Sequence, residues 1–157
     1  MKIRNYKSED FQTLRDLMII VQEAERSVEP TRQVGEQIVD KYLEFLFKEN
    51  KKNKGKILIA EVNGKIAAFI AFRIEDLDFE LISKPIKCLY ISDIAVFEKY
   101  RRHGIAKALF EQAETYAKEK KLKFIRLSVL PKNNPARELY SRIGFREFQI
   151  EMVKELK

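Results

Sequence analysis

The sequence has little cysteine, histidine, proline and glycine, and it has no tryptophan. Its 157 residues include one cysteine, one histidine, four prolines and five glycines. The single cysteine, Cys88, excludes an internal disulfide framework, and no cluster of cysteine and histidine occurs at metal-ligand spacing. We therefore expect a cytoplasmic protein that needs no metal.

The chain also lacks a long apolar run. No stretch approaches the roughly 20 apolar residues that a membrane-spanning helix needs, and residues 1–6 read as a strand and not as a signal peptide. The chain has 157 residues, of which 45% are hydrophobic, and a domain of this length buries roughly 70% of its unfolded surface. We predict a single domain, 1–157, with no membrane partner.

Positive charge exceeds negative charge, and the excess is unevenly distributed. The formal net charge is +7, and residues 91–130 alone carry nine basic and five acidic side chains. Positive potential in that segment would attract a polyanion such as a nucleotide. Nucleic acid would satisfy the same charge, but the sequence has no RNP-like aromatic motif and no zinc finger, so a nucleic-acid partner is not favoured.

Apolar spacing predicts a mixed α/β fold. We expect one helix between Ser8 and Pro30, a second helix with Val34, Ile38, Tyr42, Phe45 and Leu46 on one face, and an acidic loop between the third and fourth strands. Together these elements make a twisted mixed sheet of six to seven strands with about four helices on its faces. The expected strands are 1–6, 55–62, 65–74, 88–97, 122–130 and a last strand or hairpin in 145–156; the later helices are 32–50, 104–120 and 134–143; the loop is 75–85.

The most informative motif lies where the fourth strand passes into the third helix. Here the chain reads Arg101-Arg102-His103-Gly104-Ile105-Ala106. The first N–H groups of a helix have no partners within it and carry partial positive charge, so a strand, a basic glycine turn and a helix start can hold phosphate. Gly104 lets the backbone approach a ligand closely, and the two arginines add charged donors.

Two blocks of the sequence resemble the GNAT superfamily of N-acetyltransferases, over essentially the whole chain. The first is Ile91-Ser92-Asp93-Ile94-Ala95-Val96 followed by Arg101-x-x-Gly104-x-Ala106, which is similar to the acetyl-CoA pyrophosphate loop of that family. The second is Asn133-x-x-Ala136-x-x-Leu139-Tyr140 followed by Ile143-Gly144-Phe145, which is similar to its other cofactor and catalytic motif.

The resemblance implies a GNAT-like fold whose sheet is splayed between its fourth and fifth strands. It also implies direct transfer of an acetyl group from acetyl-CoA to a primary amine, without a metal. Asn133 would contact the cofactor near the splay. The other implied cofactor-binding residues are Ile94, Ala95 and Val96, for the pantetheine arm, and Arg101, Arg102, His103, Gly104, Ile105 and Ala106, for the pyrophosphate.

The resemblance assigns the acid more firmly than the base. Tyr140 matches the tyrosine that protonates the departing thiolate, and a phenol with an ordinary pKa of about 10 can donate to sulfur. Some relatives carry a glutamate five residues before the asparagine, but that position is Ser128 here. Asp93 is the best remaining carboxylate, because an ionised group within an apolar strand is costly without a purpose or partner. Glu75 and Asp76 acting through water, or a water relay alone, stay open as alternatives.

The acceptor is not defined by the sequence, although charge gives a direction. The loop acids Glu75, Asp76, Asp78 and Glu80 would favour a cationic acceptor such as a polyamine or a peptide or protein amine. By the same resemblance, Glu23, Glu25 and Glu29, at the junction of the first two helices, face the same cleft. The long terminal strands suggest a homodimer through free edges.

A different function also fits the sequence. The chain would then be a GNAT-like module that binds acyl-CoA without turnover.

Neither His103 nor Cys88 points to catalysis: the histidine lies within the turn, and the cysteine reads as a small buried apolar residue. The backbone of Val96 is the expected donor to the acyl oxygen.

Overall fold

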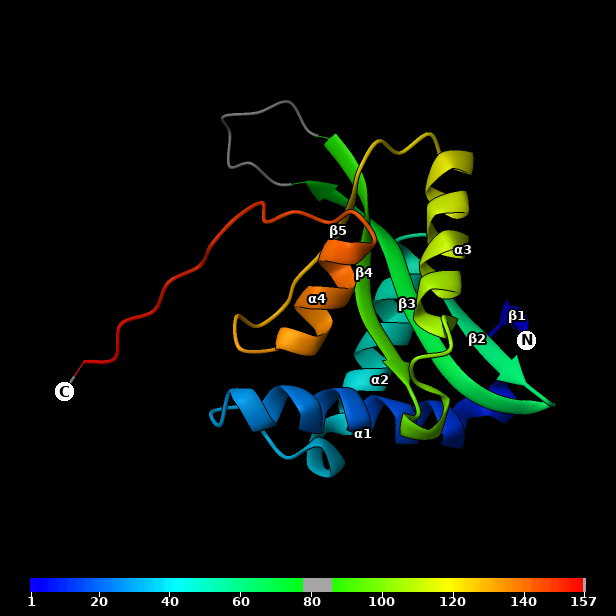
Figure 1. The fold of residues 1–157 in the computed structure, drawn as a ribbon, viewed down its shortest axis with the longest axis horizontal. Helices are drawn as coiled ribbons and strands as arrows, with labels where there is room; N and C mark the ends of the chain where they lie inside the picture. Colours follow the sequence, from blue (N-terminus) through cyan, green and yellow to red (C-terminus); the bar gives the residue numbers. More distant parts are fainter. Residues whose placement is uncertain (78–85, 157) are drawn as a thin grey trace.

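The computed structural model describes residues 1–77 and 86–156. Within them, five strands form one sheet in the order β1-β2-β3-β4-β5 (Figure 1). All neighbours are antiparallel except β4 and β5, which are parallel. The strands are β1 (Lys2–Asn5), β2 (Lys56–Val62), β3 (Lys65–Leu77), β4 (Ile86–Val96) and β5 (Ile125–Leu127).

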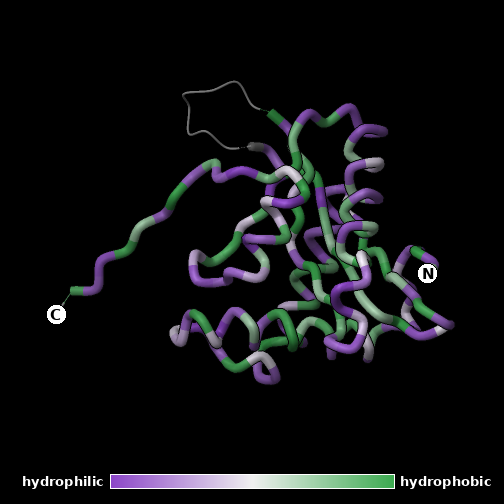
Figure 2. Tube along the Cα trace, in the orientation of Figure 1, coloured by the Kyte–Doolittle hydropathy of each residue, from purple (hydrophilic) through white to green (hydrophobic). Residues whose placement is uncertain are grey.

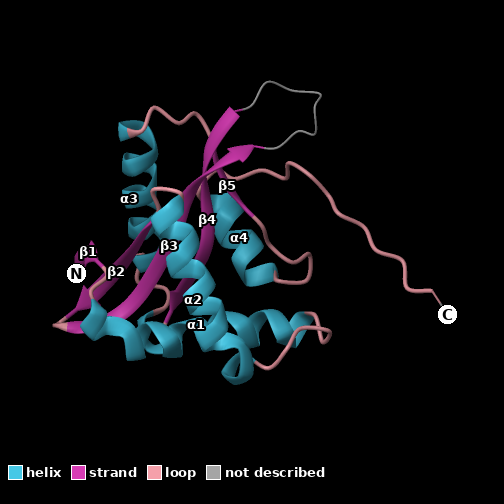
Figure 3. Ribbon diagram, turned by 180° about the vertical axis from the view of Figure 1, so that it is seen from behind, coloured by secondary structure: helices cyan, strands magenta, loops and turns pink. Residues whose placement is uncertain are grey.

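Helices cover both faces of the sheet, which confirms the mixed α/β prediction. One face carries α1 (Phe11–Val28) and α2 (Gly35–Lys52), seen from behind in Figure 3. The opposite face carries α3 (Ile105–Glu119) and α4 (Asn134–Arg142). Short 3-10 turns at Ser8–Asp10 and Glu98–Tyr100 precede α1 and α3.

The sheet separates two apolar cores, because successive side chains of a strand point to opposite faces. On β3, Ile70 and Phe72 pack towards α3 with Phe110, whereas Phe69 and Ala71 pack towards α1 and α2. Each fully buried phenylalanine contributes about 1.5–3 kcal/mol of transfer free energy. Figure 2 shows the apolar residues gathered along the central strands, with polar residues on the outer faces of the helices.

The hairpin between β2 and β3 turns at Asn63-Gly64, as predicted. Both residues have positive φ, 51° and 73°. A two-residue turn with positive φ at both positions matches the twist of the flanking strands, and Asn-Gly adopts it at the least cost.

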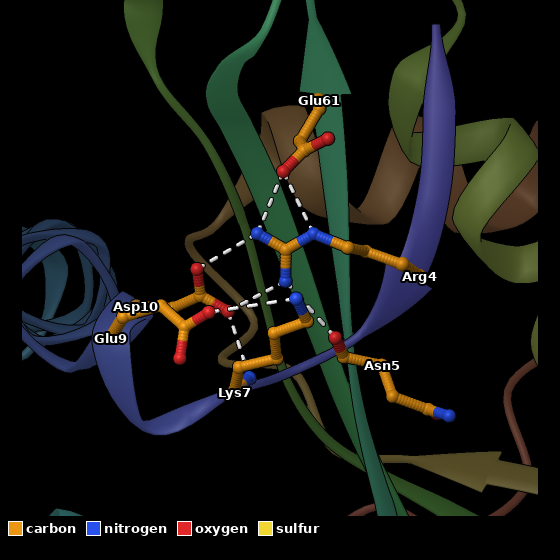
Figure 4. Close-up of polar contacts among 6 residues, drawn as sticks. All are labelled: Arg4, Asn5, Lys7, Glu9, Asp10 and Glu61. Atoms are coloured by element: carbon orange, nitrogen blue, oxygen red, sulfur yellow. Dashed lines mark hydrogen bonds and ion pairs between the residues drawn. The ribbon is translucent and has the colours of Figure 1, made fainter.

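An ion network fastens β1 to the rest of the fold (Figure 4). The Arg4 guanidinium donates to both oxygens of Asp10, at 2.7 and 2.8 Å, and to Oε1 of Glu61 at 2.7 Å. The Lys7 N–H also donates to Asp10, at 2.8 Å. The Arg4 guanidinium holds the pKa of the Asp10 carboxyl below its usual range. The contacts join β1, β2 and the start of α1.

Two predicted strands are wrong or shorter than expected. Residues 145–156 form no strand in the structure but run as an extended segment away from the body of the protein (Figure 1). The strand predicted at 122–130 shortens to β5, because residues 128 and 129 leave β4 and line a cavity. The described sheet therefore has five strands and not six to seven.

The acidic loop predicted at 75–85 begins later than expected. Strand β3 continues to Leu77, so Glu75 and Asp76 are strand residues that pair with Cys88 and Lys87. The β3–β4 ladder continues to the pair of Leu77 and Ile86, and an exposed ion pair between Lys87 and Asp76 at 3.0 Å lies across it. Asp78 and Glu80 lie outside the described residues.

The inward face of α2 is also shifted from the predicted one. Val34 and Phe45 are 40% and 49% exposed. Leu46, which was predicted to face inward, is buried, but Val39 and Leu43 complete the buried stripe. The helix starts at Gly35 and not at residue 32, and the buried stripe is fixed by packing against α1 and β3.

Candidate active site

The sheet opens between β4 and β5. The two strands pair only through Leu89, Tyr90 and Ile91, opposite residues 125–127. On its other edge β4 stays paired with β3 up to Val96, but with a bulge, because Ile91 pairs with Phe72 while Asp93 pairs with Ala71. Ser92 is the extra residue, and such a bulge bends its strand. The splay that the resemblance implied is thus present.

The free edge of β4 faces this opening. The Phe97 N–H donates to the Ala67 carbonyl at 2.9 Å, so residue 97 is bonded to β3. Because backbone groups alternate in an antiparallel pair, Ala95 also faces β3, whereas Ile94 and Val96 turn their N–H and C=O groups towards the gap. The Val96 carbonyl there accepts a hydrogen bond from Nε of Arg101 at 3.1 Å.

A cavity of about 110 Å³ fills the opening. It is lined from both faces of the sheet, by α1 on one side and by α4 on the other, because β5 no longer separates them. Residues that belong to different cores therefore meet in one space. The lining residues are Val21, Ala24, Glu25, Ile91, Ser92, Asp93, Ile94, Leu127, Ser128, Val129, Asn133, Ala136 and Tyr140.

Asp93 is the buried carboxylate of this cavity, with 7% of its surface exposed. The Tyr42 hydroxyl from α2 lies 3.0 and 3.1 Å from its two oxygens and donates to the carboxylate. Burial raises the pKa of Asp93 to about 6, the Glu25 charge adds to this, and the Tyr42 and Ser92 hydroxyls oppose it. A base with this pKa is ionised at neutral pH and can still take up a proton.

Tyr140 approaches the cavity from α4. Its ring packs edge-on against Phe110, with centroids 5.8 Å apart, and at a tilt against Phe145, with centroids 5.9 Å apart. Burial raises the pKa of Tyr140 to about 12, helped by the charges of Glu25 and Asp93. Within the described residues, no hydrogen bond engages its hydroxyl. A neutral phenol with a free O–H is a proton donor.

The predicted phosphate turn precedes α3. Gly104 is the residue before the helix and has φ of +75°, and a Cβ placed on it would meet nothing within 4 Å. Residues 101–104 are exposed. The Arg101 N–H already donates to Glu98, and the His103 ring nitrogen Nδ1 donates to the Arg101 carbonyl at 2.7 Å, so the turn is braced from within. The first amides of α3, from Ile105 and Ala106 onward, have no partners within the helix.

Asn133 lines the cavity and also caps α4. Its side chain accepts a hydrogen bond from the Ala136 N–H at 3.4 Å. Asp93, Asn133 and Tyr140 are therefore brought together, with the Ile94 and Val96 edge beside them.

The predicted acceptor residues lie elsewhere on the sheet. Glu75 accepts hydrogen bonds from Arg73, and Asp76 pairs with Lys87; neither lines the cavity. Cys88 is fully buried, and burial raises the pKa of its thiol, so it behaves as an apolar residue.

Tyr42 was not among the site residues predicted from the sequence. Its position on the half-apolar face of α2 was visible, and a tyrosine on a buried face usually carries a polar partner for its hydroxyl. The partner, Asp93, is 51 residues away in sequence, so local periodicity does not identify it.

No described helix is long and apolar enough to cross a membrane. No group of three or more histidine, cysteine, aspartate or glutamate side chains in residues 1–77 and 86–156 is arranged to hold a metal ion.

A sheet opened next to a glycine-led helix start, with a buried carboxylate and a phenol lining the gap, is an arrangement that a group-transfer enzyme of the acyltransferase class can use. The model of the acetyltransferase (GNAT) family matches residues 15–145, and the chain belongs to this family. It is therefore an N-acetyltransferase.

Relatives of the chain carry the same description. It is 33% identical over 115 residues to an N-alpha-acetyltransferase of Sulfurisphaera tokodaii, covering 71% of this chain and 69% of that protein. It is also 33% identical over 102 residues to an uncharacterized N-acetyltransferase of Methanocaldococcus jannaschii, covering 64% of this chain and 43% of the relative.

Solved structures show the same fold. A Bacillus halodurans protein, solved as a tetramutant, superposes with a TM-score of 0.86 at 24% identity, covering 99% of this chain and 100% of the other. An aminoglycoside N-acetyltransferase in complex with CoA superposes with a TM-score of 0.68 at 18% identity, covering 99% of both chains.

Proposed function

We propose that this enzyme transfers the acetyl group of acetyl-CoA directly to a primary amine in the cavity between β4 and β5. The observation that carries the proposal is that Asp93 and Tyr140 line the same cavity, one from each face of the sheet. A pKa of about 6 leaves Asp93 ionised at neutral pH, and a pKa of about 12 leaves Tyr140 protonated, which are the states that a base and an acid need.

The residues around the opening fit coenzyme A. The free edge at Ile94 and Val96 offers backbone donors and acceptors to an amide-bearing arm. The start of α3, with the open space beside Gly104 and the exposed Arg101 and Arg102, suits a diphosphate. Asn133 stands on the far side of the gap. When bound, acetyl-CoA supplies an acetyl group activated as a thioester.

Two side chains of the protein would each carry out one proton transfer. Asp93, held by the Tyr42 hydroxyl, takes a proton from the acceptor amine, which must be neutral to attack. Tyr140 stays protonated at neutral pH and donates to the departing sulfur. The Val96 N–H, turned towards the gap, stabilises negative charge on the acyl oxygen.

A route through an acetylated cysteine is not favoured. Cys88 does not line the cavity, and its thiol is buried with a raised pKa. A thiol that is neither exposed nor ionised is a poor nucleophile.

The acceptor class is an amine, and the finer choice is open to test. The name of the Sulfurisphaera tokodaii relative refers to an α-amino group, and the aminoglycoside enzyme acts on an amine of a different class. A polyamine, a peptide α-amine and a protein amine are the acceptors we propose. Glu75 and Asp76 remain predicted contacts for an outer part of the acceptor. The homodimer also remains a prediction, and light scattering would measure the mass of the protein in solution.

Release of free thiol from acetyl-CoA across a panel of primary amines tests the function. We expect release that depends on the amine, with an acetylated amine detected by mass spectrometry. Asp93→Asn and Tyr140→Phe are the matched variants, and both should bind coenzyme A as the wild type does. Tight binding of coenzyme A without amine-dependent thiol release would instead support the non-catalytic module.

A further inference from the structure

The cavity is negatively charged on a positively charged protein. The chain has a formal net charge of +7. Nevertheless, the cavity lining includes two carboxylates, Glu25 and Asp93, and no lysine, arginine or histidine among the described residues. Two carboxylates with no cation in the lining favour a ligand that carries positive charge.

The two carboxylates differ in what they can still bind. Asp93 is nearly fully buried and already accepts from the Tyr42 hydroxyl. Glu25 lies nearer the solvent, with 30% of its side chain exposed. Its charge nevertheless reaches the reacting groups, because it raises the pKa of both Asp93 and Tyr140. Glu25 is thus a partly exposed carboxylate in the lining of the same cavity as Asp93 and Tyr140.

The Glu25 carboxylate already forms an ion pair with a side chain of the protein. The Arg32 guanidinium lies 2.7 Å from Oε2 of Glu25. Arg32 belongs to the segment between α1 and α2, is 46% exposed and does not line the cavity. Exposed pairs of this kind contribute about 0–1 kcal/mol, so a cation inside the cavity can displace it at little cost.

We propose that Glu25 binds the ammonium group of the acceptor, and that Arg32 is a built-in competitor that holds this carboxylate until the acceptor displaces it. The inference rests on the proposed function, since it names a determinant of acceptor selection for that same cavity. Glu25 orients the acceptor beside Asp93, and Asp93 takes the proton.

Binding at equilibrium tests the inference without turnover. The probes are 1,4-diaminobutane and its neutral counterpart 1,4-butanediol, titrated into the whole protein by calorimetry. Glu25→Gln should weaken diamine binding about fivefold, and Arg32→Ala should tighten it about threefold, as expected for one partly exposed charge pair. The diol should not bind to any variant. The matched control is Glu36→Gln, which removes a carboxylate paired with Arg15 at 2.8 Å outside the cavity.

The double variant separates competition from a structural role of Arg32. If Arg32 acts through Glu25, removing it in the Glu25→Gln background should leave the diamine affinity unchanged. Unchanged diamine affinity in Glu25→Gln, or an equal effect of Arg32→Ala in both backgrounds, overturns the inference. Thermal midpoints confirm that each variant is folded. A protein that binds the diamine through Glu25 but never acetylates an amine would refute the proposed function and leave this inference standing.

Discussion

Replacing Asp93 by asparagine should make the protein more stable at pH 8 and remove most of its activity. Burial raises the pKa of Asp93 from 3.8 to about 6. A difference of about two pH units corresponds to roughly 3 kcal/mol of free energy. Asparagine has nearly the same shape and can still accept from the Tyr42 hydroxyl, so the substitution removes the charge with little loss of packing.

The sign of the stability change follows from how many protons Asp93 binds in the folded and in the unfolded state. Between about pH 4 and pH 6 the folded protein holds a proton on Asp93 that the unfolded chain has released, so stability falls as pH rises through this window. The stabilising contribution is complete below the unfolded pKa and is lost above the folded one. Asp93→Asn should abolish this part of the pH dependence.

Urea unfolding at pH 4, 5 and 8 measures the effect. At pH 8 the variant should exceed the wild type by up to about 3 kcal/mol, and at pH 4 the two should agree. Asp76→Asn, an exposed carboxylate paired with Lys87, is the control and should change stability by less than about 1 kcal/mol.

The same variant tests the chemistry. Loss of a general base lowers kcat by roughly 10²- to 10⁴-fold, and the wild-type kcat should rise with an apparent pKa near 6. A variant that is less stable than the wild type at pH 8 would refute the argument from burial. A kcat within tenfold of wild type, with the same rise near pH 6, would refute the role of Asp93 as base.

Four further outcomes are expected. Tyr140→Phe should lower kcat about 10- to 100-fold with little change in the KM for acetyl-CoA, measured by thiol release; an unchanged kcat removes Tyr140 from the mechanism. Tyr42→Phe removes a hydrogen bond that lowers the pKa of Asp93, so the kcat profile should shift to higher pH; no shift would contradict the contact. Gly104→Ala places a side chain at a φ of +75° beside the open space. It should weaken coenzyme A binding about tenfold or more and lower the free energy of unfolding by about 1–2 kcal/mol. Equal affinity for coenzyme A in calorimetry would place the diphosphate elsewhere. Gln22 is 8% exposed and neither side-chain amide atom has a partner among the described residues, so Gln22→Met should raise the free energy of unfolding by about 1–2 kcal/mol in urea; a loss would mean that the amide is satisfied.

The parts of the fold that depend on local sequence could be predicted. The Asn63-Gly64 turn and the glycine start of α3 need specific backbone angles, and few residue types supply them. The strand before the Gly104 turn and the helix after it were predicted to within a few residues of β4 and α3. The pattern of buried residues at helical and strand spacing was enough for this.

The parts that depend on long-range pairing could not be predicted. The segment 145–156 has apolar residues at alternate positions, but a strand requires a partner, and in the structure this segment runs free of the sheet. The contact between Tyr42 and Asp93 joins α2 to β4, and Glu25 reaches the same cavity from α1. Each is a property of packing between distant elements and not of any local pattern.

The bulge at Ser92 sets the direction of both the Asp93 side chain and the backbone groups of Ile94 and Val96. With strict alternation, Asp93 would share the face of Leu89 and Ile91 and would point into the apolar core beneath α3. The extra residue shifts the alternation by one, so the carboxylate turns to the opposite face and meets the Tyr42 hydroxyl. The same shift turns the backbone of Ile94 and Val96 towards the gap. One irregularity therefore places the base and the cofactor-binding edge together, which explains why a continuous strand pattern in the sequence did not reveal how they meet.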